Sequence, residues 1–161
     1  MKMRRKKTYF ERLPGSPEPI IAEIKHRVRF NEADPMAILW HGRYPLLFEE
    51  ASEEIGRRCG LTYEAFYASG LRVPVVEFHI DYYQPLFLNE EFTIRASFIW
   101  YEGARLNIEY HLIKQDGSLA TSGYTVQLFT DHQSGEPYII SPELLDRCRK
   151  RWKAGEFHQL Q

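Results

Sequence analysis

The stretch FNEADPMAILWHGRYPLLFEEASEEIG, residues 30–56, joins an extended segment to the most strongly patterned part of the chain. One apolar stripe recurs there at helical spacing and consists of Tyr44, Leu47, Phe48, Ala51 and Ile55. Because proline is tolerated only in the first turn of a helix, Pro45 places the helix start near Tyr44. The pattern predicts a helix over residues 44–58, which the helical rise makes about 22 Å long.

The segments that flank this helix alternate with a period of two, as strands with one buried face do. The first precedes the helix at residues 20–30, and four more follow at 72–86, 90–102, 105–115 and 118–130. Gly103 and Gly117 separate the last three segments and have the residue chemistry of tight hairpin turns. Since short turns join antiparallel neighbours, the sequence predicts an antiparallel sheet.

Two shorter elements complete the pattern. Residues 61–70 are expected to form a short helix or a loop, and Ser141 and Pro142 suit the cap and first position of a last helix. A long helix with one apolar stripe must bury that stripe, and the sheet is its only large partner. The expected fold class is therefore α+β: a curved antiparallel sheet of about five strands wrapped round one long helix, plus a short C-terminal helix.

The composition is that of an ordinary soluble domain, with 43% hydrophobic and 27% charged residues in a chain of 161. No run of 18 apolar residues is present, so no membrane span is expected. A net charge of −1 provides no overall attraction to nucleic acid. Cys59 and Cys148 have no metal-ligand or redox spacing, which indicates a reducing, cytoplasmic setting.

The charge is nevertheless unevenly distributed. The first seven residues, MKMRRKK, hold five basic side chains, and a Pro/Gly-rich segment follows at 13–19. We therefore expect residues 1–19 to be a basic flexible tail and linker, and residues 20–161 to be a single domain. A second basic run, RCRKRWK, lies at residues 147–153. The two basic ends are interpreted as a solvated tail and a helix end favoured by its dipole, or as a docking patch for an anionic partner such as an acidic carrier protein.

The loop before the helix combines residues suited to acyl chemistry. Asp34 precedes Pro35, which disfavours helix for the residue before it, so Asp34 is expected on the loop. His41 and Gly42 immediately precede the helix, where unpaired N–H groups and the helix dipole can polarise a carbonyl. A nearby acid can attack that carbonyl or activate a water. Each feature also has a simpler structural role, in a turn or a helix cap.

Together these residues resemble the 4-hydroxybenzoyl-CoA thioesterase family of hotdog-fold enzymes. The matching positions are Asp34, His41, Tyr44, Glu49 and Ala51. The chain departs from the family pattern at Glu32, where many members have aspartate, and at Arg43, which replaces a small or amide residue. It also has Ala37 where the family has glycine, so a loop that requires a positive φ there would be strained.

The resemblance implies hydrolysis of an acyl thioester on CoA or an acyl carrier protein. Asp34 would act as base or nucleophile, and His41 would place the substrate or the water. The other implied substrate- and oxyanion-binding residues are Gly42, Arg43, Tyr44 and Glu49. No metal or cofactor is expected, because a thioester carbonyl is already electrophilic.

The resemblance further implies a homodimer or a dimer-of-dimers homotetramer, with sites at the subunit boundary. Three other interpretations stay open: a hotdog dehydratase or hydratase, a non-catalytic module that binds acyl thioesters, and a partner of carrier proteins that is slow on CoA esters. His79 and Asp81 stand two residues apart on one strand and could form an acid–base or metal pair, or simply hydrogen-bond within the sheet.

Overall fold

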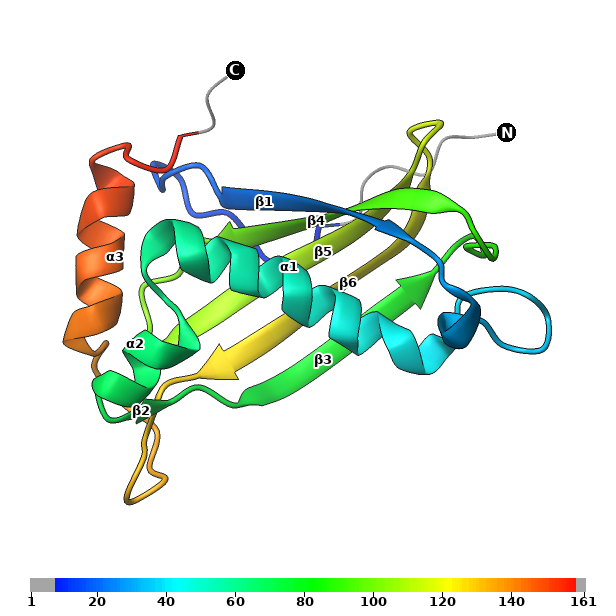
Figure 1. Cartoon of the computed structure of the whole chain (residues 1–161). Helices are drawn as coiled ribbons and strands as arrows, with labels where there is room; N and C mark the ends of the chain where they lie inside the picture. Colours follow the sequence, from blue (N-terminus) through cyan, green and yellow to red (C-terminus); the bar gives the residue numbers. More distant parts are fainter. Residues whose placement is uncertain (1–7, 159–161) are drawn as a thin grey trace.

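The computed structural model describes residues 8–158 and contains a five-stranded antiparallel sheet in the order β1-β4-β5-β6-β3 (Figure 1). The strands are β1 (Ile20–Arg27), β3 (Val75–Tyr82), β4 (Glu91–Ile99), β5 (Arg105–Lys114) and β6 (Leu119–Leu128). The long helix α1 (Tyr44–Cys59) crosses one face of this sheet, as the sequence predicted.

Smaller elements surround this pair of layers. They are η1 (Phe30–Glu32), η2 (His41–Arg43), α2 (Tyr63–Ala68), β2 (Leu71–Arg72), β7 (Thr130–Asp131) and α3 (Glu143–Lys153). Strands β2 and β7 form a separate two-stranded ribbon beside α2. Helix α3 stands at one end of the sheet, where Trp152 packs against Phe98 of β4 with ring centroids 4.8 Å apart.

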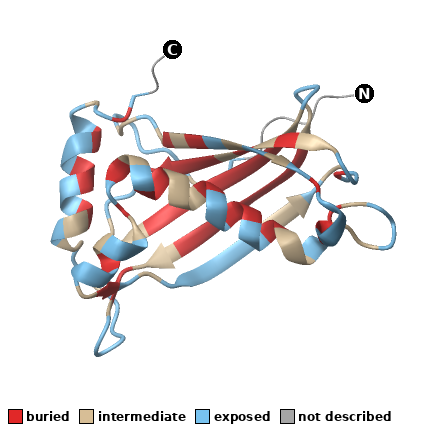
Figure 2. Cartoon of the chain, viewed as in Figure 1, coloured by how far each residue is buried: buried red, intermediate tan, exposed pale blue. Residues whose placement is uncertain are grey.

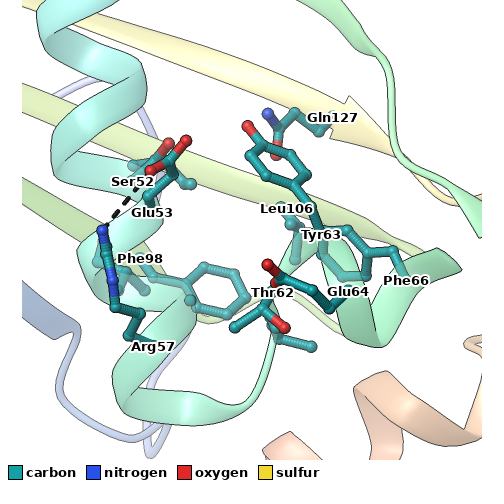
Figure 3. Close-up of a pocket in the computed structure, with 14 residues that line it drawn as sticks. Ser52, Glu53, Arg57, Thr62, Tyr63, Glu64, Phe66, Phe98, Leu106 and Gln127 are labelled. Carbon is teal, nitrogen blue, oxygen red and sulfur yellow. Dashed lines mark ion pairs between the residues drawn. The ribbon is translucent and has the colours of Figure 1, made fainter. Parts of the chain in front are cut away.

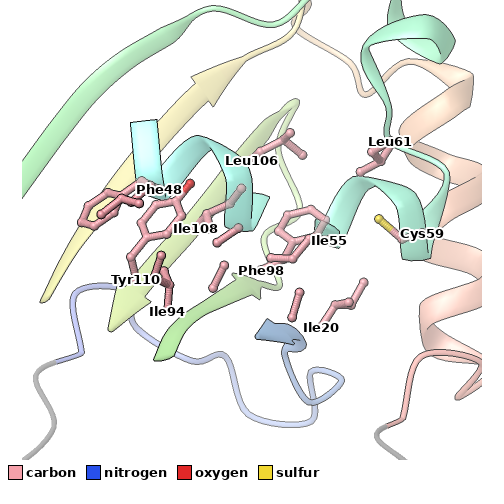
Figure 4. Close-up of a cluster of buried hydrophobic side chains, with 14 of the residues drawn as sticks. Ile20, Phe48, Ile55, Cys59, Leu61, Ile94, Phe98, Leu106, Ile108 and Tyr110 are labelled. Atoms are coloured by element: carbon pink, nitrogen blue, oxygen red, sulfur yellow. The ribbon is translucent and has the colours of Figure 1, made fainter. Parts of the chain in front are cut away.

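Helix α1 begins at the predicted residue and buries the predicted stripe. Tyr44, Leu47, Phe48, Ala51 and Ile55 are each 3% exposed or less. The Phe48 ring stacks on Tyr110 of β5, with centroids 4.2 Å apart and planes at 11° (Figure 4). Since full burial of a large apolar side chain stabilises a fold by about 1.5–3 kcal/mol, this stripe is a major source of stability.

The position of β3 differs from what chain order alone indicates. Strands β4, β5 and β6 pair with their sequence neighbours, but β3 pairs with β6 at the edge of the sheet instead of with β4. Residues 83–90 make the connection between β3 and β4 across the end of the sheet, with Leu86 fully buried. Figure 2 shows the result: the central strands are buried, whereas much of β3 is exposed.

The C-terminal helix begins one residue later than predicted. Pro142 is the residue before its first turn, with φ −68 and ψ 156, and makes no side-chain cap. The Ser141 hydroxyl instead donates a hydrogen bond to the Asp146 carboxylate within the first turn.

Part of the expected N-terminal linker lies on the outer face of the sheet. Because Tyr110 faces α1, its neighbour Glu109 faces the other way. Oε1 of Glu109 accepts hydrogen bonds from the amides of Tyr9 and Phe10, at 2.9 and 3.0 Å. The Tyr9 hydroxyl also donates to Asp81 of β3 at 2.7 Å. The basic residues 1–7 lie outside the described part of the chain.

Gly123 of β6 leaves room for the Phe48 ring of α1 and for the backbone of β3. A Cβ at this position would lie 2.3 Å from the carbonyl oxygen of His79 and 2.8 Å from Cε2 of Phe48. We predict that Gly123→Ala destabilises the fold by about 1–3 kcal/mol, because backbone and a packed ring would both have to move. Urea unfolding measures the change.

Gly42→Ala is the matched control, since the atoms nearest to a Cβ there belong to the side chain of Trp40, which is 47% exposed, and not to backbone. It should lose less stability than Gly123→Ala. Equal losses in the two variants would contradict the close packing of Phe48 and the β3 backbone around Gly123.

Candidate active site

A short hairpin presents Asp34. The Trp40 amide donates to the Glu32 carbonyl at 2.8 Å, Ala33 and Leu39 form an antiparallel bridge, and the Asp34 amide donates to Ile38 at 2.9 Å. The sheet end holds the second arm, because the Leu39 amide donates to the Leu86 carbonyl at 2.7 Å. Asp34 therefore lies in a loop with a defined backbone, as Pro35 predicted.

The carboxylate of Asp34 is half-buried and has one recorded hydrogen bond. Its Oδ1 accepts from the Met36 amide at 2.8 Å, which is the turn role that an Asp-Pro pair commonly has. Within residues 8–158, its other oxygen, Oδ2, accepts no hydrogen bond. One carboxylate oxygen thus serves the loop and the other is available for chemistry.

The helix entrance contributes two adjacent amides. Among the described residues, neither the His41 nor the Gly42 amide donates a backbone hydrogen bond, whereas the Arg43 amide donates to the Trp40 carbonyl at 2.9 Å. Arg43 was one of the implied oxyanion-binding residues, and its amide is therefore already used. The Arg43 side chain also turns to the loop, where Nη2 donates to the Asn31 carbonyl at 3.1 Å.

The hydroxyl of Tyr44 lies between the loop and the sheet. Burial raises its pKa to about 12, and the nearby Tyr82 and Asp34 add to the rise. The nearby hydroxyl of Thr121 opposes this rise in the pKa of Tyr44. The Tyr44 and Thr121 hydroxyl oxygens nevertheless do not form a well-aligned hydrogen bond. At neutral pH Tyr44 is therefore a neutral hydrogen-bond donor beside the Asp34 carboxylate.

Tyr82 and Thr121 were not predicted as site residues. Tyr82 ends β3 and meets the Tyr44 ring edge to face, with centroids 5.0 Å apart. Thr121 comes from β6 and is fully buried. Their proximity to the loop depends on strand order and register, which the alternating pattern alone does not reveal.

Glu49 lies farther along α1, away from the entrance residues. Its Oε1 accepts a hydrogen bond from the Tyr63 hydroxyl at 2.9 Å, which connects α1 to α2. Glu49 also contributes to the raised pKa of the buried Tyr110, after the larger effect of burial. The structure thus separates Glu49 from the other predicted positions and places it beside a cavity.

That cavity has a volume of about 250 Å³ and lies between the second half of α1, α2 and the sheet (Figure 3). Its floor is apolar, formed by Ile55, Phe98, Leu106 and Ile108. Its remaining lining includes polar groups from Ser52, Glu53, Thr62, Tyr63, Glu64 and Gln127. Such a mixture of apolar floor and a few polar groups is typical of small-molecule sites.

Within residues 8–158, no group of three or more His, Cys, Asp or Glu side chains is arranged to hold a metal ion. His79 and Asp81 contact each other instead, with 3.0 Å between Nε2 and Oδ2. No helix of the described chain is long and apolar enough to cross a membrane.

Comparisons with known proteins agree with this architecture. YneP of Bacillus subtilis, provisionally named an acyl-CoA thioesterase, is 26% identical over 117 residues, which cover 73% of this chain and 85% of YneP. A protein of Aquifex aeolicus, provisionally named an esterase, is 29% identical over 96 residues, 60% of this chain and 75% of that protein. The solved structure of a DHNA-CoA thioesterase from Staphylococcus aureus superimposes with a TM-score of 0.74 at 22% identity, covering 87% of this chain and 97% of that one.

The profile of the thioesterase-like superfamily matches residues 28–148, and the chain belongs to this superfamily. The predicted hotdog fold is confirmed by that match and by the structural similarity. The narrower likeness to 4-hydroxybenzoyl-CoA thioesterases stays a prediction.

Ala37, which stands where the family has glycine, adopts a backbone conformation with a positive φ. Its φ is +59, in the left-handed region that glycine adopts without strain. We predict that Ala37→Gly stabilises the protein by about 1 kcal/mol, because relief of this strain outweighs the added freedom of the unfolded chain. Urea unfolding tests it.

The matched control is Ala33→Gly, since Ala33 lies in the same hairpin with an ordinary extended φ of −87. That variant should lose stability. A loss of stability in Ala37→Gly as well would show that the loop does not store strain at this residue.

Proposed function

We propose that this protein hydrolyses an acyl-CoA thioester, with Asp34 as the base or nucleophile and the start of α1 as the electrophilic support. The proposal rests on two features: a carboxylate oxygen of Asp34 that is not used by the loop and whose charge raises the pKa of Tyr44 at the start of α1, and two adjacent amides there without backbone acceptors. The superfamily membership supports the same class of reaction.

In this proposal the amides of His41 and Gly42 bind the thioester oxygen and stabilise the negative charge that develops on it. Asp34 removes a proton from water as the water oxygen adds to the carbonyl carbon. The tetrahedral intermediate then expels the CoA thiolate, which takes up a proton, and the free acid leaves. If Asp34 instead attacks directly, the thiolate leaves first and water hydrolyses the resulting mixed anhydride.

The exposed edge strand supports a homodimer. Strand β3 presents Val75, Val76, Phe78 and Tyr82, each 43–52% exposed, on a strand whose outer edge has no partner among residues 8–158. Apolar edges of this kind invite pairing with another strand. A second copy that paired its own β3 antiparallel would satisfy both edges with one two-fold axis.

This pairing would bring the two halves of the site together. The C-terminal end of β3 lies at the entrance, where Tyr82 meets Tyr44. The N-terminal end lies at the cavity, because Val75 pairs with Gln127, which lines it. In an antiparallel pair these ends meet across the boundary, so the thioester at Asp34 of one protomer would direct its acyl group into the cavity of the partner.

The assay decides between substrates and between function classes. Thiol release from a panel of acyl-CoA esters and acyl carrier proteins separates a hydrolase from a binding module, and a carrier-protein enzyme from a CoA enzyme. Product analysis for a hydrated or dehydrated acyl chain tests the dehydratase alternative. We retain the cytoplasm as the proposed location, which the two free cysteines suit.

We predict that Asp34→Asn lowers kcat for acyl-CoA hydrolysis by about 10²- to 10⁴-fold, the range that a general base contributes. The amide keeps an oxygen for the Met36 amide, so the melting temperature should hardly change. His41→Ala should lose less, because its backbone amide stays in place. Near-native turnover by a folded Asp34→Asn variant would rule out the assigned carboxylate.

A further inference from the structure

The side chain of Glu32 is buried at the base of the loop that carries Asp34. It is 7% exposed, although glutamates are almost never buried unless paired. Its Oε2 lies 2.7 Å from Nε2 of His26 in β1, and its Oε1 lies 3.7 Å from Nε of Arg29. One close partner therefore holds this carboxylate, and one more distant cation assists.

His26 is fixed by the sheet behind it. It stands opposite Phe92 of β4 in the strand register, and the two rings meet edge to face with centroids 5.6 Å apart. The contact between Glu32 and His26 thus connects the loop to two paired strands, whose positions do not depend on the loop.

Glu32 also helps to close the base of the hairpin, because its carbonyl accepts a hydrogen bond from the Trp40 amide. The second arm of the hairpin is held separately, by the hydrogen bond that the Leu39 amide donates to the Leu86 carbonyl. The buried pair with His26 anchors the arm that leads, two residues later, to Asp34.

We propose that Glu32 is a positioning residue for Asp34: through His26 it holds the first arm of the hairpin so that the Asp34 carboxylate faces the helix entrance. The inference rests on the proposed function, since it gives Glu32 a kinetic role only through Asp34. Glu32 itself contacts no substrate. Loss of the anchor should therefore lower the rate of the chemical step and leave substrate binding in the cavity unchanged.

A neighbouring ion pair provides the matched control. Arg27 follows His26 on β1 and binds Glu91 of β4 at 2.9 Å, but these side chains are 55% and 31% exposed. Glu91→Ala removes a carboxylate from the same pair of strands without touching the hairpin, and exposed pairs of this kind contribute little.

The experiment measures kcat and KM with an acyl-CoA ester for Glu32→Ala, Glu32→Gln and Glu91→Ala, each with Asp34 intact and with Asp34→Asn. With Asp34 intact, Glu32→Ala should lower kcat about 10- to 100-fold, because a carboxylate misplaced by about 1 Å costs rate of this order. KM should stay within about twofold. Glu32→Gln keeps an acceptor for His26 and should retain most of the rate, and Glu91→Ala should match the parent.

In the Asp34→Asn background, single-turnover rates should show no further loss from Glu32→Ala, because its effect passes through Asp34. An equal loss in both backgrounds would assign Glu32 to general loop stability and overturn the proposal. A folded Glu32→Ala variant with the parent kcat would overturn it too, while Asp34→Asn reports separately on the proposed function. Should Glu32→Ala not fold, His26→Gln breaks the same pair from the other side, and the same comparison of backgrounds decides.

Discussion

The Phe48 ring of α1, packed against Gly123 of β6 and stacked on Tyr110 of β5, holds the long helix on the sheet. A Cβ at Gly123 would lie 2.8 Å from the Phe48 ring, so the glycine leaves room for this side chain against the strand. Phe48 then stacks on Tyr110, and the rest of the apolar stripe is buried on the same face. With the helix fixed along its length, the position of its first turn is fixed as well. The entrance amides can therefore act as a rigid group rather than as part of a mobile loop.

The fixed position of α1 on the sheet also separates the two parts of the candidate site. Asp34 and the free amides lie at the start of α1, whereas the cavity of about 250 Å³ lies along its second half. Both parts reach the edge strand β3, one at Tyr82 and the other near Val75. The exposed apolar edge and the divided site therefore occur on the same strand. Pairing of two β3 strands would cover the edge and bring the two parts of the site together.

Most of the fold could be predicted because local patterns encode it. The helical stripe and Pro45 located the start of α1 to the residue and its end to within one, and period-two alternation located the five main strands. The edge position of β3 could not be predicted, since alternation identifies buried faces but not strand order. The anchoring of Tyr9 and Phe10 by Glu109 was equally hidden, because one charged residue in a strand gives no sign of its partner.

The residues of the candidate site could also be predicted only in part. Asp34, His41 and Gly42 could be placed on the entrance loop because proline and the helix start constrain them locally. Tyr82 and Thr121 could not, because they reach the entrance through β3 and β6. The resemblance implied a substrate- or oxyanion-binding role for Glu49 without giving its place. Because a helix advances about 1.5 Å per residue, this side chain lies away from the entrance, toward Tyr63 and the cavity.

The most direct test of a site shared between protomers is complementation between two inactive variants. Asp34→Asn removes the carboxylate, and Gln127→Trp fills the cavity rim. After the two are unfolded together and refolded, about half of the dimers should be mixed, each with one intact site, so activity should return to about a quarter of the wild-type value. If the mixture stays as inactive as either variant alone while mixed dimers form, the two halves of the site do not meet across the boundary, and the account is contradicted.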